Sequence, residues 1–208
     1  HGEFGEDGFL SNLAQKNNIL ITHSDDLTSA LCFNKRLLKE FLKKKLKVKS
    51  PIEITESKGI KFPVISKPNR GGSSNGIKLI NNQAIFKNTL KNKQLLIEEA
   101  IIGKELTVTV LEMNKKIVPL AVTEIEFTNF IYDYKAKYVE GESVHHLPSR
   151  ISKNQYNYLL DLSVKIYKQC NCQSIARLDF ILSDLDNKFY FLELNTHPGL
   201  TKISLAPE

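Results

Sequence analysis

"IARLDFILSDLDNKFYFLELN", residues 175–195, is the stretch that most restricts the fold. Two runs rich in Ile, Leu and Phe flank "DLDN", a group of turn-forming residues, and this order predicts two antiparallel strands joined by a short turn. Asp179 and Glu193 interrupt the apolar runs. A charge on a buried strand is costly unless it is paired or holds a metal ion, so we expect this hairpin to carry a functional site.

The polar residues of the hairpin are expected to lie together. Glu193 and Asn195 are two residues apart and share one face of their strand, and strand pairing would bring Asp179 alongside. Three such oxygen donors suit Mg²⁺ that bridges nucleotide phosphates; the alternative is a polar sheet face in contact with water. Arg177 faces the same way as Asp179 and could neutralise a phosphoryl group.

From residue 63 onward the sequence predicts a mixed α+β fold with antiparallel sheets. Helical patterns cover 81–92 and 152–169. In "TEIEF", Glu124 and Glu126 alternate with Ile and Phe, as in an ordinary half-exposed strand. The expected strands, rich in Val, Ile and Leu and bounded by polar turns, are 63–67, 77–80, 94–99, 105–113 and 116–126.

The first 62 residues are mostly helical in pattern. The first helix is expected to bury one apolar face, formed by Phe9, Leu10, Leu13 and Ala14. "ILIT", residues 19–22, is interpreted as a short buried strand. Ser24 or Asp25 would cap a single helix running over 27–45.

Charge and cysteine usage restrict the class of protein. The 208 residues carry a net charge of +6, and much of it lies in the segment 35–49, whose helical spacing favours a solvated helix face over a nucleic-acid site. No apolar run is long enough to span a membrane. Cys32, Cys170 and Cys172 form no CxxC pair and are interpreted as packed, reduced thiols of a cytoplasmic protein. We therefore expect no nucleic-acid partner and no membrane segment.

"KPNRGGSSNG", residues 67–76, is too rich in Gly and Ser for a regular helix or strand. One interpretation is a surface turn, for which these residues are common. The other is a phosphate cradle, in which backbone N–H groups surround an anion and Lys67 supplies positive charge. It is not a P-loop, because no Gly-Lys-Ser/Thr ends it.

Two further segments carry weaker indications. In "LLIEEAIIGKEL", an apolar strand leads into Glu98, and Glu105 follows a glycine turn. Edge backbone there could bind a purine, and the later carboxylate could accept from ribose hydroxyls. "YDYKAKYVEG", residues 132–141, is either a mobile lid or an exposed loop.

In their order along the chain, these segments resemble the D-alanine–D-alanine ligases, a family within the ATP-grasp superfamily. The resemblance rests on "HGEFGEDG" at the start, "FNK" ending at Lys35, "VISKPNRGGSSNG", "IEEAIIGKE" and "YDYKAKY". It continues through "ARLDF", "LELNTHPGLT" and "SLAPE", and so covers all 208 residues. The fold it implies is two α+β lobes with antiparallel sheets that hold a nucleotide between them.

The sequence also departs from the family pattern. The family begins with a further stretch and ends with a helical segment beyond Glu208, so we expect this chain to be most of such an enzyme, shortened at both ends. "ITHS" has His23 where the family has Gly, and "GFLSNL" lacks the Thr and Gln that usually follow the Asp-Gly pair.

The resemblance implies ATP-dependent ligation of two D-alanines to D-alanyl-D-alanine for peptidoglycan synthesis. ATP would phosphorylate the carboxylate of the first D-alanine, and the amine of the second would then displace phosphate. The resemblance further implies two Mg²⁺ ions, which Mn²⁺ could replace, and a homodimer for the intact protein. Two alternatives remain open: another ATP-grasp amino-acid ligase, and a non-catalytic nucleotide-binding protein. D-serine as the acceptor is open as well.

The resemblance assigns roles to individual residues, each through a matching motif. The ATP-binding set is Lys35, Lys67, Gly72, Ser73, Glu98, Glu99, Ile101 and Glu105. The metal ligands are Asp179, Glu193 and Asn195. The residues near the acceptor carboxylate are Lys137, Ser204 and Leu205. The catalytic set is Ser74, Tyr138, Arg177, Gly199 and His1.

We expect three units along the chain. Residues 1–32 would be the remainder of an N-terminal substrate-binding domain. Residues 33–105 would form the central lobe with the phosphate loop. Residues 106–208 would form the C-terminal lobe, with the metal strands and a lid at 131–148, in which His145 and His146 are interpreted as exposed loop residues.

Overall fold

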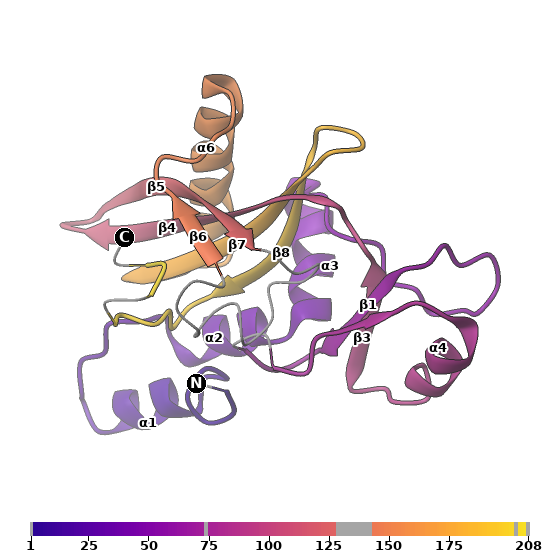
Figure 1. The fold of residues 1–208 in the computed structure, drawn as a ribbon. Coiled ribbons are helices and arrows are strands. Elements are labelled where there is room, and N and C mark those ends of the chain that lie inside the picture. Colours follow the sequence, from indigo (N-terminus) through magenta and orange to yellow (C-terminus); the bar gives the residue numbers. More distant parts are fainter. Residues whose placement is uncertain (1, 73–74, 128–142, 202–203, 207–208) are drawn as a thin grey trace.

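The strands form two antiparallel sheets, which confirms the predicted fold class. The structure is a computed structural model that describes residues 2–72, 75–127, 143–201 and 204–206. Within those residues the small sheet, in the order β2-β1-β3, consists of β1 (Val64–Pro68), β2 (Lys78–Ile80) and β3 (Leu95–Glu99). The large sheet, in the order β6-β5-β4-β7-β8, consists of β4 (Gly103–Met113), β5 (Lys116–Phe127), β6 (Ser143–His146), β7 (Ile175–Ser183) and β8 (Phe189–Asn195) (Figure 1).

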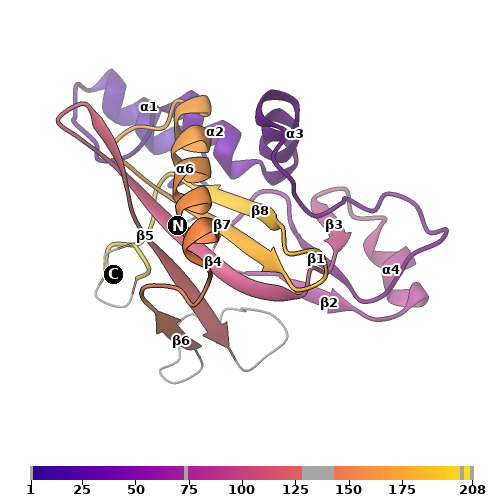
Figure 2. The ribbon, with the colours of Figure 1, turned by 90° about the horizontal axis from the view of Figure 1, so that it is seen from above.

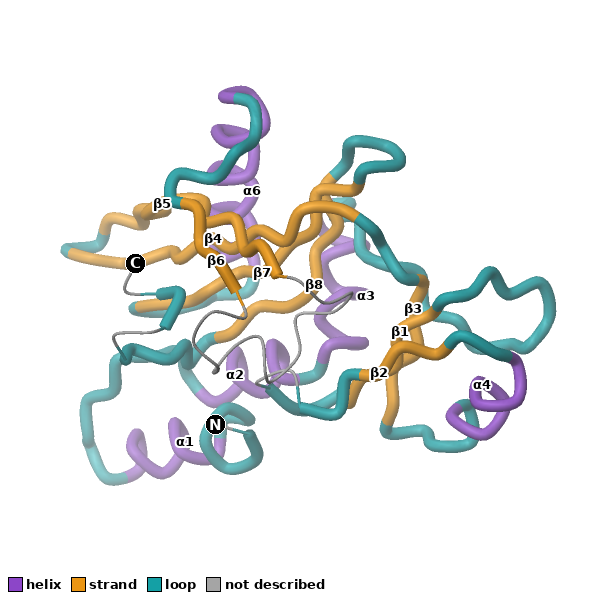
Figure 3. Tube along the Cα trace, viewed as in Figure 1, coloured by secondary structure: helices purple, strands orange, loops and turns teal. Residues whose placement is uncertain are grey.

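The helices lie around the two sheets (Figure 3). Those in the described residues are α1 (Phe9–Lys16), α2 (Asp26–Phe33), α3 (Lys35–Leu46), α4 (Gln83–Thr89) and α6 (Lys153–Gln169). Helix α4 packs on the small sheet through Phe86, whereas α2, α3 and α6 lie on one face of the large sheet (Figure 2). None of the helices described is both long and apolar enough to cross a membrane.

The two faces of the large sheet differ in chemistry because side chains alternate along each strand. Leu106 and Val108 of β4 and Leu178 of β7 are fully buried in the main core, together with side chains of α3 and α6. Thr107 and Asp179 lie between these apolar residues and pair across the two strands. One face therefore holds the core, and the opposite face is available for polar groups.

A β-bulge in β8 changes which face of the large sheet its side chains occupy. Asp179 pairs with Glu193 and Phe180 pairs with Phe191, so Leu192 is an extra residue on β8. Because of this extra residue, Phe191 enters the core while Glu193 lies beside Asp179. Simple alternation would have put Phe191 and Glu193 on the same face.

The predicted helix over 27–45 is wrong, because the chain forms two helices there. Asn34 has φ −93° and ψ 94°, which ends α2, and its side chain accepts a hydrogen bond from the backbone of Leu37 to cap α3. Of the two candidate caps for α2, Asp25 is the one observed, since its carboxylate accepts from the Thr28 N–H at 2.8 Å.

The buried strand predicted at 19–22 is also wrong. No strand is assigned to these residues, and Leu20 is 99% exposed. A strand needs a neighbouring strand for its backbone hydrogen bonds, and none of the described strands pairs with this segment. Helix α1 forms as predicted, but Phe9 and Leu13 on its apolar face are about half exposed.

Strand β6 lies in a segment that sequence patterns did not identify as a strand. It pairs with β5, so His145 lies opposite Ile125 and His146 opposite Glu124. Both histidines are half-buried, which corrects their interpretation as exposed loop residues. The short segment has no periodic apolar pattern, and its strand conformation comes from pairing with β5.

Candidate functional site

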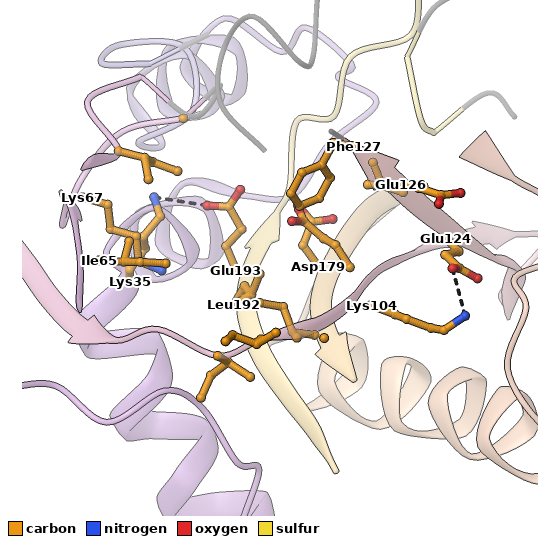
Figure 4. A pocket seen from close by; sticks show the side chains of 18 of the residues that line it. Lys35, Ile65, Lys67, Lys104, Glu124, Glu126, Phe127, Asp179, Leu192 and Glu193 are labelled. Carbon is orange, nitrogen blue, oxygen red and sulfur yellow. Dashed lines mark hydrogen bonds and ion pairs between the residues drawn. The ribbon is translucent and has the colours of Figure 1, made fainter. Parts of the chain in front are cut away.

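A cleft of about 520 Å³ lies between the two sheets and is lined by residues of both. Figure 4 shows Lys35 and Lys67 on one side and Glu193 and Asp179 facing the same space from β8 and β7. Apolar side chains complete the lining, and they are Ile65, Pro68, Ile77, Ile101, Ile102, Ile125, Phe127, Ile181 and Leu192. The cleft therefore combines apolar walls with opposed cations and carboxylates.

Lys35 connects helix α3 to the glycine loop and to Glu193 on β8. It is the first residue of α3, and its backbone N–H donates to the Asn69 carbonyl at 3.1 Å. Its buried side chain donates to the Gly71 carbonyl at 2.6 Å, and the Lys35 Nζ lies 3.3 Å from Glu193 Oε2. The start of α3 and the glycine loop are thus held together beside the cleft.

The described ends of the glycine loop face the cleft, since Gly71, Gly72 and Asn75 line it. At Gly72 a Cβ atom would lie 2.9 Å from Glu6 Oε2, so a side chain at this position would displace the Glu6 carboxylate. Glu6 is buried and also accepts from the Gly2 N–H at 2.7 Å. Sequence reasoning missed Glu6, whose only signal was its place in "HGEFGEDG".

On the side of the cleft opposite the lysines, Asp179 is buried and accepts several hydrogen bonds. Arg177 donates to it from Nε at 3.0 Å and from Nη2 at 2.9 Å, and the Thr107 hydroxyl donates at 2.7 Å. Glu193 lies directly opposite across the strand pair and also lines the cleft. The hydrogen bonds from Arg177 and Thr107 reduce the cost of burying the charge of Asp179.

Asn195, the third predicted metal ligand, lies further along β8, opposite Arg177. Its side-chain oxygen accepts from the His197 N–H at 2.8 Å, and it is not among the residues that line the cleft. Two carboxylates and an amide are hard oxygen donors of the kind that Mg²⁺ prefers, so the donor set fits the predicted ion. Within the described part of the chain, no group of three or more His, Cys, Asp and Glu side chains is arranged for metal binding.

Lys67, one of the two lysines that line the cleft, also belongs to a buried ionic triad, which we define as Lys39, Lys67 and Glu98. Glu98 contacts Lys39 through Oε1 and Lys67 through Oε2, the latter at 2.8 Å. Burial, with Lys67 nearby, lowers the pKa of Lys39 to about 7. Burial opposes ionisation of Glu98, but Lys67 and Lys39 together lower the pKa of its carboxylate. Lys39 was expected on a solvated helix face; it is 7% exposed, which corrects that interpretation.

The predicted adenine and ribose residues are placed differently from one another. Ile101 and Glu105 line the cleft. The side chain of Glu98 lies in the triad, and the Glu99 carboxylate accepts from the Ile52 N–H at 3.0 Å. Neither of these two glutamates lines the cleft.

Glu124 is buried, contrary to its interpretation as part of a half-exposed strand. It accepts from Lys104 Nζ at 3.0 Å, from Arg150 Nη2 at 2.7 Å and from the Arg150 N–H at 2.8 Å. Burial opposes its ionisation, but these hydrogen bonds lower the pKa of Glu124 to about 2. All three residues line the cleft, and alternation within β5 offered no sign of the two cations.

The end of the chain lies close to β5. Leu205 is buried against Ile125, and the Ser204 hydroxyl accepts from the Thr201 N–H at 3.1 Å. Gly199 is half-buried. The predicted residues His1, Ser73, Ser74, Lys137 and Tyr138 lie outside the described residues.

Two antiparallel sheets with a charged cleft between them match the ATP-grasp architecture, and solved structures agree. The whole chain aligns with VanG D-Ala:D-Ser ligase from Enterococcus faecalis at a TM-score of 0.84 and 27% identity, and it covers 64% of that chain. It aligns with D-alanine–D-alanine ligase from Bacillus anthracis complexed with ATP at a TM-score of 0.77 and 26% identity, and it covers 70% of that chain. The fold is that of an ATP-grasp protein.

Sequence comparison narrows this class to one family. A family model described as "D-ala D-ala ligase C-terminus" matches residues 34–208. The D-alanine–D-alanine ligases of Rickettsia canadensis and Rickettsia massiliae are each 42% identical over 219 positions, which include the whole of this chain. That of Thermotoga maritima is 34% identical over 215 positions. The chain belongs to the D-alanine–D-alanine ligase family. It spans 61% of the length of the Rickettsia canadensis relative, 67% of the Rickettsia massiliae relative and 70% of the Thermotoga maritima relative.

Proposed function

We propose that the protein containing this chain joins two D-alanine molecules at the expense of ATP, for peptidoglycan synthesis. A carboxylate oxygen of the first D-alanine attacks the γ-phosphorus of ATP, which yields an acyl phosphate and ADP. The amine of the second D-alanine then attacks the acyl carbon, loses a proton and expels inorganic phosphate. The names of the relatives and the full coverage of this chain support the proposal.

The observation that carries this proposal is the opposition of cations and carboxylates across one cleft. Lys35 and Lys67 line one side, and Asp179 and Glu193 line the other. Phosphoryl transfer needs little covalent chemistry from the protein and depends on positioning and on neutralising negative charge. The buried lysines suit the ATP phosphates, and the opposed carboxylates suit phosphate-bound Mg²⁺.

The remaining residues keep the roles that the resemblance implies, and of these Gly72, Ile101 and Glu105 line the cleft. Gly72 would present its backbone to the phosphates, Ile101 would contact adenine, and Glu105 would accept from the ribose hydroxyls. Arg177 and the Gly199 N–H would stabilise the tetrahedral intermediate. Glu98 and Glu99 remain near the adenine end in this proposal, with Glu98 acting through the triad. Ser204 and Leu205 would lie near the acceptor.

The residues that would hold the two expected Mg²⁺ ions are Asp179, Glu193 and Asn195. A divalent cation there would neutralise charge on the transferred phosphoryl group, and Mn²⁺ has similar ligand preferences. The roles of His1, Ser73, Ser74, Lys137 and Tyr138 rest on the resemblance alone. So do the division at 32/33 and 105/106, the lid at 131–148 and the homodimer, whereas the cytoplasmic location rests also on the interpretation of the three cysteines as reduced thiols.

The test is release of phosphate from ATP by the complete gene product, with D-alanine, D-serine or D-lactate as the second substrate. We expect one phosphate for each D-alanyl-D-alanine formed, both measured in the same reaction, and loss of both products in Asp179→Asn. A mixed product with D-serine would reassign the acceptor. ATP binding without any dipeptide or depsipeptide would overturn the proposal and support the non-catalytic alternative.

A further inference from the structure

The triad contains two cations around one carboxylate, and only one of the cations reaches the cleft. Lys67 lines the cleft, whereas Lys39 and Glu98 do not. The exposed fractions of the three side chains are 8% for Lys39, 3% for Glu98 and 10% for Lys67, so water screens their charges little. Each oxygen of Glu98 faces a different lysine.

Without Lys39, the remaining pair would be a poor site for an anion. A buried Lys67–Glu98 pair alone has no net charge, and the carboxylate would compete with any incoming phosphate for the Lys67 ammonium. When it is protonated, Lys39 raises the net charge of the triad to +1. It also takes up one carboxylate oxygen, so that Lys67 does not have to neutralise Glu98 alone.

We propose that Lys39 is a positioning residue for the phosphate subsite. Its pairing with one oxygen of Glu98 leaves the positive charge of Lys67 available in the cleft to bind a nucleoside di- or triphosphate. The inference rests on the proposed function, in which Lys67 contacts phosphate. Lys39 lies one helical turn after Lys35 on α3, so the same face of this helix supplies one lysine to the cleft and a second one to the triad.

The surroundings of Lys39 favour this role. The charged groups that face it are Lys67 on β1 and Glu98 on β3. Glu193 acts on Lys67 from β8. Arg36, three residues before Lys39 on α3, is paired with Glu53 at 2.7 Å. Although burial opposes it, contact with Glu98 raises the pKa of Lys67, so the proton that the triad releases most readily is that of Lys39.

The experiment measures binding of ATP, ADP and adenosine to the complete gene product by calorimetry. Lys39→Met removes the charge at nearly constant volume. We expect ATP and ADP affinity to fall roughly tenfold, as for loss of a charged hydrogen bond, and adenosine affinity to change less than about twofold. Lys39→Arg keeps the charge and should stay within about twofold of wild type for all three ligands. Lys43→Met, at an exposed position of the same helix, is the matched control.

The outcomes separate this inference from the proposed function. If Lys67→Met keeps full ATP affinity, the phosphate site itself is assigned wrongly. If Lys67→Met loses affinity and Lys39→Met does not, the inference about Lys39 is overturned. An equal loss for ATP and adenosine in Lys39→Met would show a merely structural role and would overturn it too.

A second readout does not depend on the folding of Lys39→Met. Because the pKa of Lys39 is about 7, its charge falls as the pH rises above neutrality, and ATP affinity of the wild type should fall with it. An arginine stays charged over this range, so the affinity of Lys39→Arg should fall less. Titration of ATP itself is common to both proteins. Identical pH profiles of ATP affinity for wild type and Lys39→Arg, measured from about pH 6 to about pH 9, would overturn the inference, because this range covers the titration of Lys39.

Discussion

At the scale of single residues, the cleft depends on carboxylates whose charge is stabilised by neighbours from other elements. Glu124 is buried on β5, and its partners Lys104 and Arg150 come from β4 and from the segment before α6. The side chains of these partners are 38% and 48% exposed. Neutralising Glu124 would therefore leave the two cations in contact with water and no unpaired buried charge, which limits the cost.

The pKa of Glu124 leads to a prediction for acid stability. Its folded-state pKa, about 2, lies below the ordinary value of 4.5, so its contribution is present above pH 4.5 and is lost as the pH falls toward 2. Glu124→Gln should lower the free energy of unfolding at pH 7 by about 1 to 3 kcal/mol. Urea unfolding of wild type and variant at pH 7 and at acid pH measures this difference.

The difference between wild type and Glu124→Gln should shrink at acid pH, because the wild-type carboxyl group is then protonated in the unfolded chain. Glu56→Gln, at an exposed carboxylate, is the control and should have little effect at either pH. A destabilisation of equal size at both pH values would contradict the assigned pKa.

At the scale of elements, the break between α2 and α3 sets the position of Lys35. Asn34 accepts from the Leu37 N–H at 3.2 Å and from Asn69 Nδ2 at 2.9 Å. The first contact caps α3, and the second joins the cap to the chain just after β1. A single continuous helix would have carried Lys35 on a different path, away from the loop that follows β1.

Asn34→Ala should therefore affect both stability and binding. Loss of an N-cap costs about 0.5 to 2 kcal/mol, and this change also removes the contact with Asn69. We expect a lower melting temperature together with weaker ATP binding, measured by differential scanning calorimetry and by titration. Asn82→Ala removes the cap of α4, where Asn82 accepts from the Ile85 N–H at 3.0 Å, and is the control.

The two cap variants separate general destabilisation from an effect on the cleft. Asn82→Ala should lower the melting temperature and leave ATP affinity close to wild type, because α4 does not line the cleft. Equal ATP affinities in both variants would count against the link between the α3 cap and Lys35.

At the scale of the whole molecule, the cleft belongs to neither sheet alone. Lys67 comes from β1 of the small sheet, and Asp179 and Glu193 come from β7 and β8 of the large sheet. Ile101 and Ile102 lie in the short connection between β3 and β4. A ligand that fills the cleft therefore contacts both sheets and should stabilise both.

Hydrogen exchange of the complete protein tests this expectation. A non-hydrolysable ATP analogue should slow amide exchange in β1 and in β7 together, since binding to the folded state lowers the population of open forms. Lys67→Ala at the same analogue concentration should show less protection in both strands. Protection confined to one sheet would show that the ligand does not bridge the cleft.

Part of this architecture could be predicted because its signals are local. The alternation in 175–195 predicts the β7–β8 hairpin, and the periodic apolar residues of 152–169 predict α6, because strand and helix periods depend on near neighbours in the chain. The strand predictions from residue 63 to residue 126 are confirmed for the same reason. The acids at 179 and 193 could be singled out because a charge among buried apolar residues needs a partner.

The sequence by itself therefore determined every described strand except β6, most of the helices, and two of the acids that line the cleft, Asp179 and Glu193. Only the tertiary structure decided which lysines of α3 are buried, where Glu124 finds its cations and which way β8 turns at Leu192. Lys39 and Lys43 have the same helical periodicity, yet β1 and β3 supply partners only for Lys39. The physical reason is that burial and pairing depend on neighbours that are distant in sequence, whereas propensity and periodicity report only on adjacent residues.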